Sequence, residues 1–289
     1  MTVPTAQART SFDARDVALA FVAARRAARS LQGFPGALPG DLAQAYAVQE
    51  AAIGLWPDTV AGWKVGAIPR ELQAELQAER VIGPVFHANV WTAGPEPTPL
   101  PVIAGGFAAV EAEYVYRIGR DAPAGKLDWT PEESLDYVER MFVGVEFAGS
   151  PLATINVLGP RAVASDFGNN AGLVLGPTVP DWRRTDDWPP CEAYVDDRFA
   201  GRGSPASLAG GPPGALAFLM SACAGRGRPL KAGQLVTTGA ASGIHDIEAG
   251  QTARIAFGGL GEIRCVAQRA QAEGSPGGSD HGQRDVHHG

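Results

Sequence analysis

The sequence contains few of the residues that bind soft metals or form disulfides. Of its 289 residues, three are cysteine and five are histidine. Cys191, Cys223 and Cys265 are far apart and form no CxxC pair. Neither a disulfide framework nor a thiolate metal site is therefore expected. We expect the three thiols to be buried, reduced and structural.

Histidine is equally scarce in the part of the chain that is expected to fold. His281, His287 and His288 lie in EGSPGGSDHGQRDVHHG, whose Gly, Ser and charged residues predict a disordered tail over residues 271–289. His87 and His245 remain, and each is either a structural histidine or a functional one.

The sequence also lacks long apolar runs and clusters of basic residues. No run is long enough to span a membrane, and MTVPTAQART has neither the basic start nor the apolar stretch of a secretory signal. The formal net charge is −7, and basic residues form no cluster larger than short pairs such as Arg25-Arg26 and Arg183-Arg184, which argues against a nucleic-acid partner. We therefore expect a cytoplasmic protein with a small-molecule partner, no membrane and no nucleic acid.

Motifs of nucleotide-binding proteins and serine hydrolases are missing as well. No G-x-x-x-x-G-K-[ST] loop occurs, and GRGSPASLAGG lacks both the G-x-G-x-x-G order and a preceding strand. In GAASG, Ser242 stands one position too late for a nucleophile elbow.

Periodicity predicts an α+β protein. Apolar residues at helical spacing, with acidic starts, predict helices over residues 13–31 and 41–56. After residue 102 most segments alternate like strands between Gly and Pro turns, with few helices. We expect an N-terminal helical segment over residues 1–60 and a β-rich catalytic domain over residues 61–270. Further helices are expected over residues 70–80, 132–139 and 214–224. Strands are expected over residues 61–68, 83–91, 110–118, 141–149, 171–177, 191–197, 233–240 and 253–268.

Three glutamates stand in strand-like runs. In VEAEYVYRIG, Glu111 and Glu113 project from the same face of an extended chain. The simpler alternative is a half-exposed strand with a solvated glutamate face. In RMFVGVEFAGS, Glu146 has apolar neighbours on both faces, so a buried central strand is expected. A carboxylate held there needs a partner.

The nature of that partner has two possible answers. If the two strands are neighbours, three carboxylates converge, and a divalent cation would relieve their repulsion. Oxygen ligands without His or Cys favour Mg²⁺ or Mn²⁺. Alternatively an arginine, such as Arg117 or Arg161, pairs with Glu146 and makes the cluster structural.

Lys64 is a lone charge in the apolar run AGWKVGAI. Its ammonium either extends along the strand edge to water or faces a polar cavity. In a cavity, a lowered pKa would suit it to proton transfer.

The segments GWKVG, VEAE, GVEF, GNNAG, RPLKAGQLVTTG and GGLGEI follow one another in this order. Over residues 13–268 the set resembles the 2-keto-4-pentenoate hydratase and 4-oxalocrotonate decarboxylase branch of the fumarylacetoacetate hydrolase superfamily. The resemblance implies a mixed, twisted β-roll or sandwich core around a deep pocket, a small N-terminal helical segment and a homo-oligomer.

The resemblance also implies roles for single residues. Glu111, Glu113 and Glu146 fall on the family's Mg²⁺ or Mn²⁺ ligands, and Lys64 on its active-site lysine. Thr238 and Gly239 match a loop that contacts substrate.

Three segments depart from the family's pattern. The turn that carries an aspartate in related hydratases aligns near Val81, which leaves Glu79 as the nearest acid. Gly149, Ser150 and Pro151 replace an Asp-Ser-Arg sequence, and the segment 168–172 also differs.

The implied reaction is metal-dependent lyase chemistry on a 2-oxo or 2-hydroxy-dienoic acid, as in degradation of aromatic compounds. Hydration of a 2-hydroxypenta-2,4-dienoate is the leading expectation. The alternatives are a decarboxylase, a C–C hydrolase of acylpyruvase type with Glu79 or His245 as base, or a member of the family that has lost catalysis.

Overall fold

The computed structural model describes residues 12–184 and 188–274. Most of the expected tail, including its three histidines, lies outside these ranges. Within them, none of the helices is long and apolar enough to cross a membrane. The helices are α1 (Ala14–Arg26), α2 (Leu42–Leu55), α3 (Arg70–Leu76), α4 (Pro131–Leu135), α5 (Pro160–Ser165) and α6 (Gly211–Gly225), with 3₁₀ turns at His87–Asn89, Phe167–Asn169 and Pro205–Ser207.

The two N-terminal helices are confirmed, each with an aspartate at its start. Asp13 accepts hydrogen bonds from the backbone of Arg15 and Asp16, and Asp41 accepts one from Gln44. Such caps satisfy N–H groups that have no partner inside the helix. Helix α1 is shorter than expected, since it ends at Arg26.

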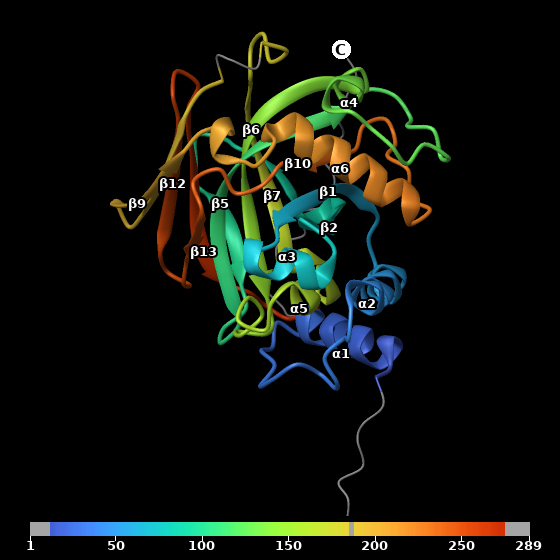
Figure 1. The fold of residues 1–289 in the computed structure, drawn as a ribbon. Coiled ribbons are helices and arrows are strands. Elements are labelled where there is room, and N and C mark those ends of the chain that lie inside the picture. The colour runs from blue at the N-terminus through green and yellow to red at the C-terminus, as the bar shows by residue number, and fades with distance from the viewer. Residues whose placement is uncertain (1–11, 185–187, 275–289) are drawn as a thin grey trace, which may run out of the picture.

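Eight strands form one large, strongly curved sheet. Its order is β2-β1-β10-β5-β6-β7-β3, and β11 also pairs with β5. The long antiparallel strands β5 and β6 lie at its centre (Figure 1). The strands of this sheet are β1 (Val60–Ala67), β2 (Arg80–Phe86), β3 (Val90–Thr92), β5 (Phe107–Ile118), β6 (Val138–Ser150), β7 (Asn170–Thr178), β10 (Leu235–Thr237) and β11 (Ile244–Asp246).

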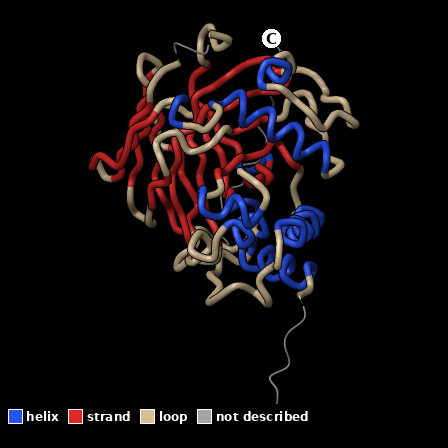
Figure 2. The backbone as a smooth tube through the Cα atoms, viewed as in Figure 1, coloured by secondary structure: helices blue, strands red, loops and turns tan. Residues whose placement is uncertain are grey.

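A second sheet of five strands covers one face of the first. The order is β4-β13-β12-β8-β9, and the helices gather on the other side of the molecule (Figure 2). Tyr114 of β5 points towards this second sheet, with its ring 6.1 Å from that of Phe257. Its strands are β4 (Thr98–Val102), β8 (Cys191–Val195), β9 (Arg198–Gly203), β12 (Thr252–Phe257) and β13 (Gly261–Arg269).

The opposite face of β5 lines the inside of the curved sheet. Val115 packs there against Val85, Leu173 and Leu235, which come from β2, β7 and β10. Strands that are not neighbours in the sheet meet in this way only because the sheet curls. Strand β5 is therefore buried on both faces, and the half-exposed alternative is wrong.

The α+β fold with a mixed, curled core and N-terminal helices is confirmed. The expected helix at 132–139 is shorter, because β6 already begins at Val138. The sequence did not predict β4, β9, β11 or α5.

Candidate metal centre

Glu111, Glu113 and Glu146 converge on the inner face of the curved sheet. The register of β5 and β6 places Glu111 directly opposite Glu146, and antiparallel partners share a face. Each glutamate offers one carboxylate oxygen, and these oxygens lie within 4.8 Å of one another. All three residues are buried.

Burial and repulsion make the carboxyl groups of Glu111 and Glu113 difficult to ionise. Desolvation, followed by the charge of Glu146, raises the pKa of Glu111 to about 8. The same causes, with added repulsion from Glu111, raise the pKa of Glu113 well above its usual value. A cation at this point would favour the ionised forms.

The bonding of Glu113 fits a divalent cation. Its Oε2 accepts hydrogen bonds from the backbone N–H groups of Thr238 at 2.9 Å and Gly239 at 2.8 Å. Its Oε1 is buried and has no hydrogen-bond partner among residues 12–184 and 188–274. Since such an oxygen costs free energy if it stays unpaired, the three carboxylates form a ligand set suited to Mg²⁺ or Mn²⁺.

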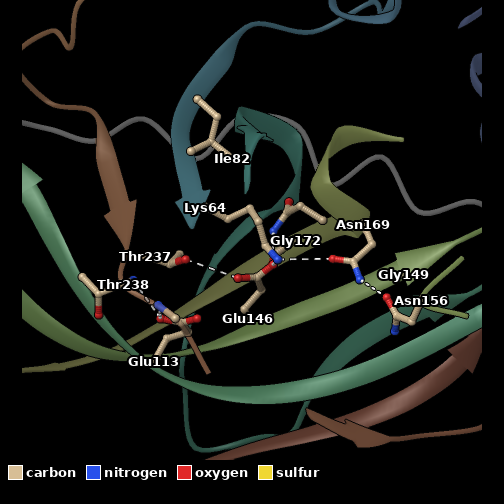
Figure 3. A network of polar contacts seen from close by, with 12 residues as sticks. Lys64, Ile82, Glu113, Glu146, Gly149, Asn156, Asn169, Gly172, Thr237 and Thr238 are labelled. Atoms are coloured by element: carbon tan, nitrogen blue, oxygen red, sulfur yellow. Dashed lines mark hydrogen bonds and ion pairs between the residues drawn. The ribbon is translucent and has the colours of Figure 1, made fainter. Parts of the chain in front are cut away.

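Other polar groups fix the orientation of Glu146. Asn170 Nδ2 donates to its Oε1 at 3.1 Å, and the Thr237 hydroxyl donates to its Oε2 at 3.2 Å. Hydrogen bonds of this kind orient carboxylate ligands in metal sites. Figure 3 shows Thr237 and Thr238 approaching the carboxylates from the same segment.

The Lys64 ammonium lies inside this network. Its Nζ is 3.2 Å from Glu146 Oε1 and donates to Asn169 Oδ1 at 3.2 Å (Figure 3). The side chain is buried, so the alternative of a lysine that reaches water is wrong. Asn169 in turn donates to Asn156 Oδ1 at 3.0 Å.

The expected lowering of the Lys64 pKa is also wrong. Burial acts to lower it, but the three carboxylates, Glu146 above all, outweigh burial and raise the pKa of Lys64 above its ordinary value. Surrounded by these groups of the chain, the Lys64 amine is therefore protonated and acts as a hydrogen-bond donor.

The arginines considered as partners of Glu146 make other contacts. Arg161 pairs with Glu75 at 3.3 Å and bonds the carbonyl of Gly40. The Arg117 guanidinium lies over the ring of Phe142. The cation that pairs with Glu146 is Lys64.

Glu79 and His245 lie apart from the carboxylates. The Glu79 side chain is 73% exposed and pairs with Arg80. His245 lies opposite Val110 in the β11–β5 pairing, on the other face from Glu111. Its ring contacts Ser242 at 3.2 Å and lies beside Gly201 of β9. Desolvation lowers the pKa of His245.

The sequence pointed to six members of the network, namely Glu111, Glu113, Glu146, Lys64, Thr238 and Gly239. It gave no role to three others. Thr237, Asn169 and Asn170 are uncharged, and a neutral amide or hydroxyl in a strand or turn gives no signal comparable to a buried charge. The available signal was the asparagine pair in the segment GNNAG, residues 168–172.

The sequence and the fold both have named relatives. No family model matches the chain. It is 28% identical to a 2-keto-4-pentenoate hydratase of Burkholderia vietnamiensis over 233 residues, which cover 78% of this chain and 86% of that protein. It is 26% identical to 2-keto-4-pentenoate hydratase 2 of Dechloromonas aromatica over 235 residues, with the same shares covered.

Solved structures show the same fold at lower identity. A 4-oxalocrotonate decarboxylase from Pseudomonas putida G7, complexed with magnesium and adipate, matches with a TM-score of 0.74 and 16% identity, over 89% of this chain and 99% of that one. A fumarylpyruvate hydrolase from Pseudomonas aeruginosa, in complex with Mn²⁺ and pyruvate, matches with a TM-score of 0.52 and 18% identity, over 72% and 88%. The chain is therefore similar in sequence to 2-keto-4-pentenoate hydratases, and it shares the fold of the 4-oxalocrotonate decarboxylase.

Proposed function

We propose that the protein is a Mg²⁺- or Mn²⁺-dependent lyase that hydrates 2-hydroxypenta-2,4-dienoate or a close analogue. The observation that carries the proposal is the group of three buried carboxylates with Lys64 beside it. The relatives named 2-keto-4-pentenoate hydratase support the substrate class.

Glu111, Glu113 and Glu146 would hold the ion. A bound Mg²⁺ or Mn²⁺ supplies Lewis-acid chemistry towards the carboxylate and keto oxygens of a 2-oxo acid. Thr237, Thr238 and Gly239 keep the carboxylates in place through the hydrogen bonds described above. Since Thr238 and Gly239 reach Glu113 through their N–H groups, we assign them this orienting role beside the predicted contact with substrate.

Lys64 is the proposed general acid. The dienol becomes a 2-oxo-3-enoate when C5 gains a proton and the C2 hydroxyl loses one. Water then adds across the C3–C4 bond, with its oxygen at C4 and a proton at C3. In this proposal Lys64, which lies next to Glu146 and Asn169, would exchange the proton at its Nζ with these carbons.

The C–C hydrolase alternative has less support from the geometry. It needs a base that activates water, but Glu79 is exposed and His245 faces away from the carboxylates. Substitution of either by alanine is expected to leave turnover within about twofold of wild type, because neither touches the proposed machinery. A loss of about 100-fold or more would favour the hydrolase.

The proposal is tested by a proton NMR time course with fresh 2-hydroxypenta-2,4-dienoate, with Mg²⁺ and then with EDTA. We expect 4-hydroxy-2-oxopentanoate only with the metal. In parallel, Glu146→Gln should abolish both Mn²⁺ binding and turnover while the fold persists by circular dichroism. A Glu146→Gln variant that binds Mn²⁺ as tightly as wild type would overturn the metal assignment.

Unchanged substrate would move the proposal to another member reaction. The same samples with 4-oxalocrotonate distinguish decarboxylation, which releases CO₂, from hydration. No metal-dependent reaction on any 2-oxo acid is the result expected of a non-catalytic relative.

A further inference from the structure

The turn that carries Asn169 has an unusual backbone. Phe167, Gly168 and Asn169 all have positive φ angles, of 54°, 64° and 54°. Glycine adopts such angles freely and asparagine tolerates them, but a phenylalanine there is strained. Strained residues persist where surrounding contacts hold them, and they are frequent at functional sites.

This left-handed turn, Phe167–Asn169, aims two amides at the site. Asn169 Oδ1 accepts from Lys64, and the next residue, Asn170, donates to Glu146. A shift of the turn would therefore change the surroundings of the proposed acid and of one proposed metal ligand together.

One side of the turn rests directly on the β1–β2 pair. Gly83 lies opposite Lys64 in the sheet, and a Cβ on Gly83 would stand 2.0 Å from the carbonyl oxygen of Phe167. A Cβ on Gly168 would lie 3.2 Å from Lys64 Cδ. The turn is thus packed directly against the backbone of β2 at Gly83 and against the side chain of Lys64.

The other side is held by an arginine from the first helix. Arg25 of α1 makes a two-point ion pair with Asp166, with Nε at 2.6 Å from Oδ1 and one terminal nitrogen at 3.0 Å from Oδ2. The same nitrogen donates to the carbonyl of Gly149 at 2.8 Å, and the Ser150 hydroxyl donates to Asp166 at 2.6 Å. The Arg25 guanidinium also lies 5.3 Å from the centre of the Phe167 ring.

This ion pair is buried, with exposures of 8% for the Arg25 side chain and 0% for that of Asp166. Taking both charges out of water is costly, and a pair of well-packed apolar residues often stabilises a fold as well or better. Stability alone therefore gives a weak reason for the pair. What the planar guanidinium adds is a fixed direction for Asp166, the residue directly before the turn.

We propose that Arg25 is a positioning residue: with Asp166 it holds the turn Phe167–Asn169 so that Asn169 meets Lys64 and Asn170 meets Glu146. The proposal rests on the proposed function for its effect on metal binding and catalysis. It assigns to the N-terminal helical segment a part in building the site, although α1 lies more than a hundred positions from the turn in sequence.

The test compares Arg25→Met, Arg25→Lys and Asp166→Asn with a matched control, Glu50→Gln. Glu50 also forms a partly buried ion-pair group, with Arg226 and Arg228, but it does not touch the turn. Two quantities are measured: hydrogen exchange of the segment 166–172 by mass spectrometry, and the affinity for Mn²⁺ alone from the signal of free Mn²⁺ in electron paramagnetic resonance.

We expect Arg25→Met and Asp166→Asn to speed exchange in 166–172, where the Asn169 N–H donates to Asp166 O at 2.8 Å, and to weaken Mn²⁺ binding about tenfold. Compared with Arg25→Met, Arg25→Lys should restore thermal stability. It should restore only part of the exchange protection of 166–172 and of the Mn²⁺ affinity, because lysine lacks the two-point geometry. Glu50→Gln should lower the melting temperature without changing either quantity.

Unchanged exchange in the segment, or faster exchange with unchanged Mn²⁺ affinity, would overturn the proposal. If Arg25→Met fails to fold, Arg25→Lys and Asp166→Asn supply the same comparison. If the wild type does not bind Mn²⁺, the proposed function fails, and the exchange data alone then decide whether Arg25 holds the turn.

Discussion

The ionisation of Glu111 and Glu113 links the site to pH. Both carboxyl groups have pKa values raised by burial and by neighbouring carboxylates, Glu111 to about 8, whereas in an unfolded chain they lie near about 4.3. Between these values the folded state binds more protons than the unfolded state, so stability falls as pH rises.

We therefore expect the melting temperature in EDTA to fall between pH 5 and pH 8. Glu111→Gln, which cannot ionise at that position, should flatten the dependence. Scanning calorimetry of both proteins at several pH values checks this. A melting temperature that rises with pH in EDTA would contradict the raised pKa values.

Replacing Lys64 should separate metal binding from catalysis. Lys64→Met removes a cation 3.2 Å from Glu146 Oε1, so we expect Mn²⁺ to bind at least as tightly as in wild type. Turnover should fall by about 100-fold or more, because the proposed general acid is gone. Mn²⁺ titration and NMR rates on the same samples measure the two effects. If Mn²⁺ affinity and turnover were lost together, Lys64 would be a structural residue.

The residues alone pointed to the three glutamates and Lys64, whereas the neutral Thr238 and Gly239 were predicted only through the family resemblance, and Thr237, Asn169 and Asn170 were given no role. Glu146 and Lys64 each stand alone in an apolar run, and a buried charge demands a partner. Asn169 and Asn170 carry no charge, so the sequence alone does not indicate that they need a particular partner. Arg25 was equally hidden, because it resembles any basic residue near a helix end and its partner Asp166 lies 141 positions away.

Among the strands, the contact of Gly83 with the left-handed turn offers a direct test. Gly83→Ala places a methyl group 2.0 Å from the Phe167 carbonyl, so the turn or β2 must move. We expect a loss of about 1–3 kcal/mol in unfolding free energy, with weaker Mn²⁺ binding.

Gly54→Ala is the matched control: a Cβ there meets nothing within 4 Å in helix α2, and alanine should stabilise the helix by about 0.5–1 kcal/mol. Denaturant unfolding measures both, and equal effects would show that Gly83 is not a contact point.

Helices and strands with strong periodicity were predicted well from the sequence. Edge strands and very short strands were not. Strand β4 carries Pro99 and Pro101, which argue against a strand, but it lies at the edge of the second sheet, where proline is tolerated. Strand β10 keeps three residues of the expected 233–240. The segment then turns to present the backbone N–H groups of Thr238 and Gly239 to Glu113.

Across the fold, the site joins segments that are distant in the chain. Its carboxylates come from β5 and β6, Lys64 from β1, and the hydrogen-bonding groups from β10 and from the turn before β7. Sequence patterns located most of these segments, but which of them meet is set by the pairing of β10 between β1 and β5, a long-range choice that no local pattern encodes.

Because one ion would contact both central strands, its binding should stabilise the fold as a unit. Mn²⁺ at about 100 times its dissociation constant adds about 2.7 kcal/mol to the unfolding free energy, which corresponds to a rise of about 4–5 °C in melting temperature for a chain of this size. We expect a single calorimetric transition that moves up with Mn²⁺ and returns with EDTA. Glu146→Gln should show no shift. A shift of equal size in that variant would mean that Mn²⁺ binds elsewhere, and the carboxylates would then be a structural cluster whose charge is relieved by protonation and by Lys64 alone.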